Sequence, residues 1–451
     1  MSSNGSMAFL LFAALIVSSC GTKEQSKTGK ARISYNCAAN AVEIKHLQDE
    51  LSSFADSQGV EIVLQPFTGQ EKLYAMIAAG QPPDIFYTNN VLRDRLAAEG
   101  RLLDMRSLSA GDPFVGRLWP DVYRQGFSAD SGLYSVGNWN FTAGVYYNKD
   151  LFDKAGLQYP DTSWTWNDFL AAARRMAAEK NASGEPEHYG LFIPSHFVEI
   201  FELMNGAPVQ ERSLFLNFSE ASLEVYRQYL ALMNDRLMPD LRRMQAMGMQ
   251  ASQLLQTGKV AMLVEAVPHQ VLFETLTIRW GVAPIPRFGI RPVRCFRSES
   301  GGLSISSQTE NPQAAWKALK WIIAGASIYQ PNPVLRDADF VSGWEARYPQ
   351  LVGSGFREVW QRSLEYPAGD PRFFVRFSSW TSASILERLQ PLLDKLWARE
   401  TTVEALAASQ SEINRAARTE LDRLIQHGGL GKEFITAIKE QLLQAAREPQ
   451  R

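Results

Sequence analysis

The residue types that most often carry out chemistry are sparse in this chain. Its three cysteines stand at positions 20, 37 and 295 without a CxxC pair, and its five histidines never recur at HxxxH spacing. These spacings argue against a disulfide scaffold, a Cys-rich zinc module and zinc catalysis. GxSxG, GxxxxGK and GxGxxG motifs are also missing. The sequence therefore predicts neither a nucleophile-elbow hydrolase nor a nucleotide-dependent enzyme, and we expect no cofactor and no metal ion.

Cys37 is the one side chain that supports an enzymatic alternative. It follows a predicted strand at Ile33–Tyr35, where a thiolate facing a cleft could act as a nucleophile. The nearest histidine, His46, is expected some turns along the next helix, so the spacing supplies no base. A free cysteine is more often a small buried hydrophobic residue, and a disulfide with Cys295 is a third possibility.

Composition indicates an ordinary globular protein. The chain has 451 residues, of which 45% are hydrophobic and 21% charged, and its formal net charge is −2. This length predicts two or three domains, each able to bury its own core. The balanced charge lacks the basic excess that nucleic-acid binding usually needs, so we expect no nucleic-acid partner.

The amino-terminal residues predict export and lipid anchoring. Met7–Val17 form 11 consecutive apolar residues, typical of a signal-peptide core and too short for a membrane-spanning helix, which needs about 20. The sequence Val17-Ser18-Ser19-Cys20 resembles the lipobox of bacterial lipoproteins, although no Lys or Arg precedes it. We expect a signal peptide at 1–19, lipidation of Cys20 and a flexible tether at 20–30, which anchor the protein on the periplasmic or extracellular face of the membrane. An ordinary secretory signal is the alternative.

The elements that must position any site begin with alternating short strands and helices. Strands are predicted at Ile33–Tyr35, Val60–Leu64 and Asp84–Tyr87, with amphipathic helical runs after each. This order predicts a mostly parallel α/β sheet, whose ligands lie beyond the carboxyl ends of the strands. The loops at Asn36–Asn40 and Thr88–Asn90 are therefore candidate ligand loops.

Other signals predict helices farther along the chain. Thr165 and Asp168 form a capping box before an amphipathic run, and a helix at Gln250–Thr257 is expected to end at Gly258. Residues 380–426 are expected to be helical, with breaks near Pro391 and near Thr401-Thr402. No repeat of 20–50 residues is visible, which argues against solenoids and propellers.

Several stretches together resemble the extracellular solute-binding proteins of ABC importers, in the branch of maltose-binding and other sugar-binding proteins. They occur in that family's order over roughly residues 30–425. The stretches are PPDIFY at 82–87, Tyr134, VYYNKDLF at 145–152, WTWNDF at 164–169, GKVAM at 258–262, WGVAP at 280–284, Gly301-Gly302 and NPQAAW at 311–316.

The resemblance implies a type II periplasmic-binding-protein fold of class α/β. Two lobes, each a mostly parallel sheet flanked by helices, close around a hinge. The expected limits are 31–138 plus 303–335 for the N-terminal lobe, and 141–298 plus 340–451 for the C-terminal lobe. The implied function is non-catalytic. A monomer captures a small solute, a carbohydrate, in the interlobe cleft and delivers it to the ABC permease subunits of the cytoplasmic membrane. A ligand-presenting sensor is an alternative.

A carbohydrate site needs aromatic platforms next to polar side chains that reach the hydroxyl groups. The candidates are Asn36, Asn89, Asn90, Asn138, Trp139, Glu265, Gly301, Gly302 and Trp380. The resemblance implies that Trp139 lies at a lobe crossover lining the cleft and that Trp380 corresponds to a ligand-stacking aromatic residue of the maltose-binding relatives. It also implies a polar ligand contact at Asn89 and Asn90.

Most of these positions also have a structural explanation. Trp139 could pack in the hinge, Trp380 could belong to the core, and Asn89 or Asn90 could cap a helix. The two glycines could form a simple turn. Glu265 stands near the place where many relatives carry a Gly-x-Trp whose ring stacks on sugar. If Glu265 contacts the ligand, the ligand could be amino-bearing or polyol-like.

Overall fold

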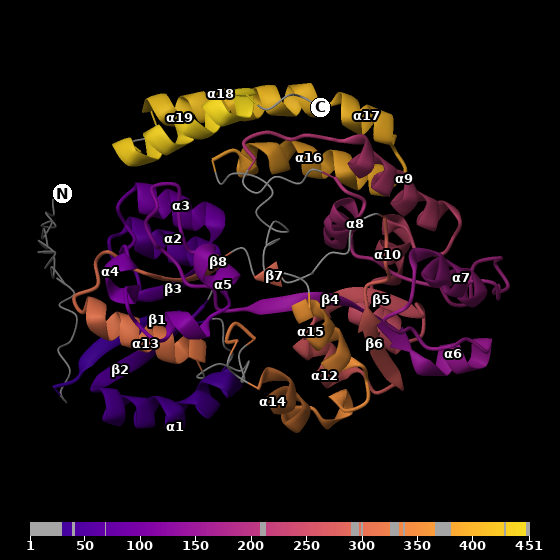
Figure 1. The fold of residues 1–451 in the computed structure, drawn as a ribbon, viewed down its shortest axis with the longest axis horizontal. Coiled ribbons are helices and arrows are strands. Elements are labelled where there is room, and N and C mark those ends of the chain that lie inside the picture. The colour runs from indigo at the N-terminus through magenta and orange to yellow at the C-terminus, as the bar shows by residue number, and fades with distance from the viewer. Residues whose placement is uncertain are drawn as a thin grey trace, which may run out of the picture.

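The chain folds into two lobes, each built around its own β-sheet (Figure 1). The computed structural model describes residues 29–37, 41–67, 69–207, 213–289, 297–298, 301–324, 333–336, 339–365, 380–427 and 430–447. Within these ranges, no helix combines the length and the apolar character that crossing a bilayer requires.

The sheet of the N-terminal lobe has the strand order β2-β1-β3-β8. Its strands are β1 (Ala31–Cys37), β2 (Val60–Pro66), β3 (Ile85–Asn89) and β8 (Gly301–Ile305). β1 pairs in parallel with β2 and β3, whereas β8 runs antiparallel to β3. The mostly parallel sheet predicted for this lobe is therefore confirmed, with β8 returning from the other lobe as the antiparallel strand.

Helices cover both faces of this sheet because the side chains of each strand alternate between two cores. Ile85 lies in the core beneath α1 and α13, and its neighbour Phe86 lies in the core beneath α2 and α3. The helices of this lobe are α1 (Ala41–Gln58), α2 (Gln70–Ala78), α3 (Asn90–Ala98), α4 (Arg106–Ser109), η1 (Val115–Arg117), α5 (Pro120–Arg124) and α13 (Pro312–Ala324).

The sheet of the C-terminal lobe has the long strand β4 (Asn140–Asn148) at its centre. β5 (Met262–Val267) and β6 (Trp280–Pro284) flank it, and β7 (Arg297–Ser298) pairs with its start. All three pairings are antiparallel, so the mostly parallel sheet expected in this lobe is wrong. The cause is that β4 enters from the N-terminal lobe and runs against the direction of β5 and β6.

Two apolar cores sandwich this second sheet. Val145 and Tyr147 face the core that α7, α8, α9 and α16 share, while Tyr146 between them faces the core of α12, α14 and α15. The helices here are α6 (Lys149–Ala155), α7 (Trp166–Met176), η2 (Ser195–Phe197), α8 (Val198–Met204), α9 (Glu220–Asn234), α10 (Leu241–Met247), α11 (Ala251–Gln256), α12 (Gln270–Thr275), α14 (Phe340–Arg347), η3 (Pro349–Leu351) and α15 (Phe356–Glu365). The capping box of Thr165 and Asp168 is confirmed at the start of α7.

Four further helices end the chain: α16 (Ser382–Trp397), α17 (Val403–Ala408), α18 (Gln410–His427) and α19 (Lys432–Arg447). The expected break near Thr401-Thr402 lies between α16 and α17, but the expected break at Pro391 is wrong because Pro391 lies inside α16. Leu389 and Leu396 on either side are buried, so core packing keeps the helix continuous although proline lacks one N–H donor.

The described residues place three passages of the chain between the lobes. Val136 bridges Leu303, and Asn140 pairs with Ser298, so an outgoing and a returning segment lie antiparallel next to each other. A third passage follows residues 334–336. The Trp119 N–H donates to the Val334 carbonyl at 3.0 Å in the N-terminal lobe, whereas α14, which begins at Phe340, belongs to the other lobe.

Candidate functional site

The carboxyl ends of β1 and β3 meet at one edge of the first sheet, next to the passages between the lobes. Asn36 lies opposite Phe86 in the register of β1 and β3, and Asn89 lies opposite Gly301 in the register of β3 and β8. Asn90 begins α3 directly after this edge. Candidate residues from three distant parts of the sequence therefore lie at one edge of the sheet, where ligands of α/β sheets commonly bind.

The two asparagines at the strand ends also make local hydrogen bonds. The Asn36 Nδ2 donates to the Gln65 carbonyl of β2 at 3.4 Å. The Asn89 Oδ1 accepts from the Leu92 N–H at 2.8 Å, which makes Asn89 the N-cap of α3. Asn89 therefore caps a helix, which is the structural explanation considered for it. The Nδ2 amino group of Asn89 and the half-buried Asn90 are polar groups that this loop offers to a ligand.

Gly301 and Gly302 allow three backbones to approach closely. A Cβ atom on Gly301 would lie 2.2 Å from the Thr88 carbonyl oxygen, and one on Gly302 would lie 2.3 Å from the Val136 carbonyl oxygen. Both distances are far below van der Waals contact. The glycines are thus explained by strand packing at the crossover, and the simple turn considered for them is wrong because both lie inside β8.

Asn138, Trp139 and Asn140 occupy the outgoing passage between the lobes. The Trp139 ring is half-buried and lies 6.3 Å from the ring of Trp344, at an interplanar angle of 53°. Asn140 is only 3% exposed, and its Oδ1 has no hydrogen-bond partner among the residues that the structure describes. Asn140 is a buried acceptor next to the predicted site that sequence reasoning did not single out, since an asparagine beside a tryptophan carries no burial signal.

Glu265 contributes charge from the C-terminal lobe. It lies on β5 opposite Gly144 of β4, and its Oε1 accepts from the Ala266 N–H at 2.8 Å. Burial raises the pKa of Tyr146 well above its usual value, and the negative charge of Glu265 adds to this effect. The Tyr146 hydroxyl therefore stays protonated and donates to the Ala266 carbonyl at 2.9 Å.

Trp380 is packed in an apolar cluster. Only 7% of it is exposed, and its ring meets that of Phe434 edge-on with centroids 5.9 Å apart. These contacts favour the core interpretation of Trp380 over ligand stacking.

Cys37 is also buried, with 3% exposure at the end of β1. The described residues contain no group of three or more His, Cys, Asp or Glu side chains that could hold a metal ion. Cys20, the predicted lipidation site, and Cys295, the possible disulfide partner, lie outside the described residues.

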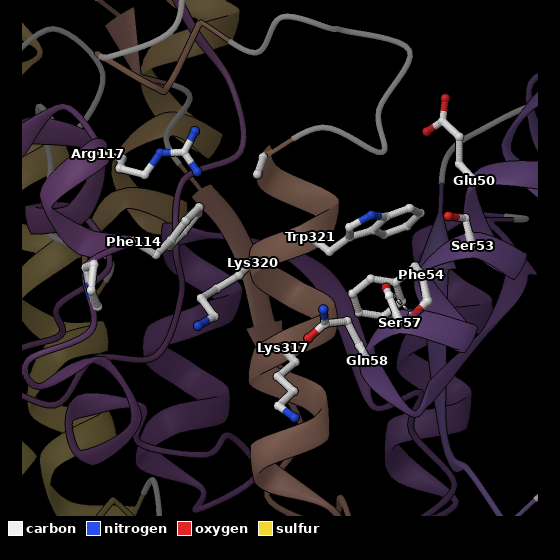
Figure 2. A pocket seen from close by; sticks show the side chains of 12 residues that line it. Glu50, Ser53, Phe54, Ser57, Gln58, Phe114, Arg117, Lys317, Lys320 and Trp321 are labelled. Carbon is white, nitrogen blue, oxygen red and sulfur yellow. Dashed lines mark hydrogen bonds between the residues drawn. The ribbon is translucent and has the colours of Figure 1, made fainter.

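A separate open groove of about 740 Å³ lies on the flank of the N-terminal lobe (Figure 2). Phe54 of α1 and Trp321 of α13 form its aromatic wall with ring centroids 4.7 Å apart, and Arg117 and Lys317 supply positive charge. None of the nine candidate residues lines this groove. Its walls come from three segments far apart in the sequence, so no sequence motif indicates it.

The fold agrees with comparisons to known proteins. A family model described as "Bacterial extracellular solute-binding protein" matches residues 45–324, which is more than half of the 451 residues. The chain belongs to this family.

Individual relatives are distant. A binding protein of Brucella abortus (strain 2308) is 29% identical over 219 residues, 46% of this chain and 47% of the relative, so the match spans about half of that protein's length. The sn-glycerol-3-phosphate-binding periplasmic protein UgpB of Rhizobium meliloti (strain 1021) is 24% identical over 334 residues, 71% of this chain and 73% of the relative.

Solved structures share the fold. An ABC substrate-binding protein from Listeria monocytogenes, solved in complex with cycloalternan, superimposes with a TM-score of 0.63 at 20% identity, covering 89% of this chain and 100% of that chain. The predicted two-lobed α/β fold class is confirmed.

His269, just after β5, makes the stability of this region dependent on pH. Its side chain accepts a hydrogen bond from the Leu272 N–H at 3.3 Å and caps α12, and burial lowers its pKa below the usual value of 6.5. Below about pH 6.5 the unfolded chain therefore binds a proton that the folded protein does not, so the free energy of unfolding falls as the pH decreases.

We expect His269→Asn, which keeps a capping side chain, to reduce this pH dependence. Urea unfolding of both proteins at pH 7.5 and 5.5 measures it, and the wild type should lose more stability between the two. The exposed His427 supplies the control, since His427→Asn should behave as the wild type does. Equal losses in the wild type and His269→Asn would contradict the assignment.

Proposed function

We propose that this protein is the solute-binding component of an ABC importer, with a carbohydrate as its solute. The observation that carries the proposal is the family match over residues 45–324. The strand-end edge supports it, because its polar side chains lie beside the passages between the lobes, one of which carries the half-buried Trp139. Such a combination suits the apolar faces and hydroxyl groups of a sugar.

The proposed solute contacts come from both lobes. Asn36, Asn89, Asn90, Gly301 and Gly302 belong to the edge of the first sheet, and Glu265 belongs to the second. Asn138 and Trp139 lie between them. A solute that touches both groups binds the closed arrangement better than the open one, so it shifts the lobes toward closure.

Binding without catalysis is the activity we propose. The enzymatic alternative required Cys37 to act as an accessible nucleophile, and its burial at 3% exposure favours a packing role instead. The same proposal includes three further statements. The lobes have the limits expected from the sequence, the protein is a monomer, and it delivers its solute to permease subunits. The half-buried Glu265 leaves room for a polyol-like solute, and one relative is named for binding sn-glycerol 3-phosphate.

A thermal-shift screen of the soluble chain tests the function. We expect a mono- or oligosaccharide to raise the melting temperature, because a ligand at 100 times its Kd adds about 2.7 kcal/mol to the free energy of unfolding. Polyols, amino sugars and sn-glycerol 3-phosphate form separate arms of the screen. A shift with sn-glycerol 3-phosphate alone would replace the carbohydrate assignment, and no shift with any arm would contradict solute capture of these classes.

Trp139 separates a solute platform from hinge packing. If its exposed face stacks on sugar, Trp139→Ala should weaken binding by about 1.5 kcal/mol or more with little change in the stability of the unliganded protein. Trp316→Ala serves as the core control, because Trp316 is 3% exposed and its loss should cost about 3–5 kcal/mol of folding stability. Titration calorimetry and urea unfolding measure the two quantities. A stability loss in Trp139→Ala with unchanged affinity would assign Trp139 to packing.

Export and lipid anchoring through Cys20 form a further proposal, supported by the apolar run and the lipobox-like sequence before it. We expect Cys20→Ser to move the protein from the membrane fraction to the soluble fraction of cells while its solute affinity stays unchanged. Cys295→Ser is the matched control and should remain with the membranes. Equal membrane retention of Cys20→Ser and wild type would rule out this anchor.

A further inference from the structure

The last two helices of the chain contact both lobes. α18 begins against the C-terminal lobe, where the Asn414 side chain exchanges two hydrogen bonds of 2.8 Å with the backbone of Leu216. The Gln410 Oε1 also accepts from the Phe218 N–H at 2.6 Å. These bonds fix the first turns of α18 to the segment that leads into α9.

The other end of α18, together with α19, lies over the N-terminal lobe (Figure 1). Leu421 of α18 and Phe434 and Ile438 of α19 are at most 4% exposed. They share one apolar cluster with side chains of α2 and α3, which are Leu73, Ile77, Leu92, Leu96, Ala97 and Ala98.

This cluster also includes side chains from segments tied to the C-terminal lobe. Leu214 belongs to it and lies two residues before Leu216, whose backbone Asn414 holds. Trp380, which lies just before α16, packs edge-on against Phe434. The lobes therefore cannot move apart as rigid bodies unless this cluster opens or α18 bends.

The contact is apolar in character. The described ion pairs of α18 join residues within the helix, Arg418 with Asp422 and Arg423 with Glu420, and none reaches α2 or α3 in the described part of the chain. Burial of apolar surface is nondirectional and scales with area. Such a contact can separate and re-form without matching specific polar partners.

We propose that α18 and α19 form an interlobe latch. Their apolar contact with α2 and α3 holds the lobes together, and its release accompanies lobe opening. The strength of this contact sets the ratio of open to closed protein before any solute binds. The latch does not depend on the identity of the solute or on a permease.

Substitutions on α19 test the latch in the full-length chain without added solute, with Cys20→Ser in every variant so that the protein is released from the membrane. Phe434→Ala removes a buried ring, and we expect it to raise the ratio of open to closed protein by roughly ten-fold or more. Ile438→Val removes one methyl group, so it should give a smaller change of the same sign. Leu443→Ala is the matched control, because Leu443 lies on the same helix and is 60% exposed.

Solution scattering reports opening as a larger radius of gyration, and hydrogen exchange reports it as faster exchange in α3 and α19 together. We expect both changes in Phe434→Ala and, more weakly, in Ile438→Val, with protection of the second sheet unchanged. If the variants are folded and less stable but keep the wild-type radius of gyration and α3 protection, α19 is only a structural cap and the latch is wrong. If Phe434→Ala does not fold, Ile438→Val decides by the same criteria.

Discussion

Three backbones come into close contact where the chain crosses between the lobes, and both lobes depend on this contact. Val136 and Leu303 exchange two backbone hydrogen bonds of 2.9 Å, while β8 pairs with β3 on its other side. A side chain at Gly301 or Gly302 would occupy the space of a neighbouring carbonyl group. This crossing lies at the edge of the first sheet that also carries Asn36, Asn89 and Asn90. Close packing and solute binding therefore constrain neighbouring positions.

Local sequence signals predicted the first lobe better than the second. Strand and helix alternation over residues 33–98 specifies a parallel sheet, since a helix between two strands returns the chain to the same end. Strand direction in the second lobe depends on where β4 enters, and the apolar runs at 262–267 and 280–284 carry no information about this. Pro391 shows the same limit of local sequence signals. The helix α16 continues through this proline because distant residues bury Leu389 and Leu396 on either side of it.

The candidate site shows the same limit at single residues. Asparagine after a strand is equally suited to cap a helix or to bind a solute, and Asn89 performs the first role in a position that permits the second. Trp139 and Trp380 are both tryptophans near predicted helix or crossover boundaries. Their environments differ because Phe434, far along the chain, covers Trp380. Sequence patterns place such residues near a cleft but do not tell which ring is covered.

The two kinds of interlobe contact have different mechanical roles. Paired backbone segments at the crossing restrict how the lobes turn, because their hydrogen bonds are directional. The apolar latch of α18 and α19 opposes separation without restricting direction. For a solute that binds only closed lobes, the apparent Kd equals the intrinsic Kd divided by the closed fraction. When that fraction is small, a stronger latch tightens binding in proportion, so α19 tunes affinity although none of its described residues belongs to the proposed solute contacts.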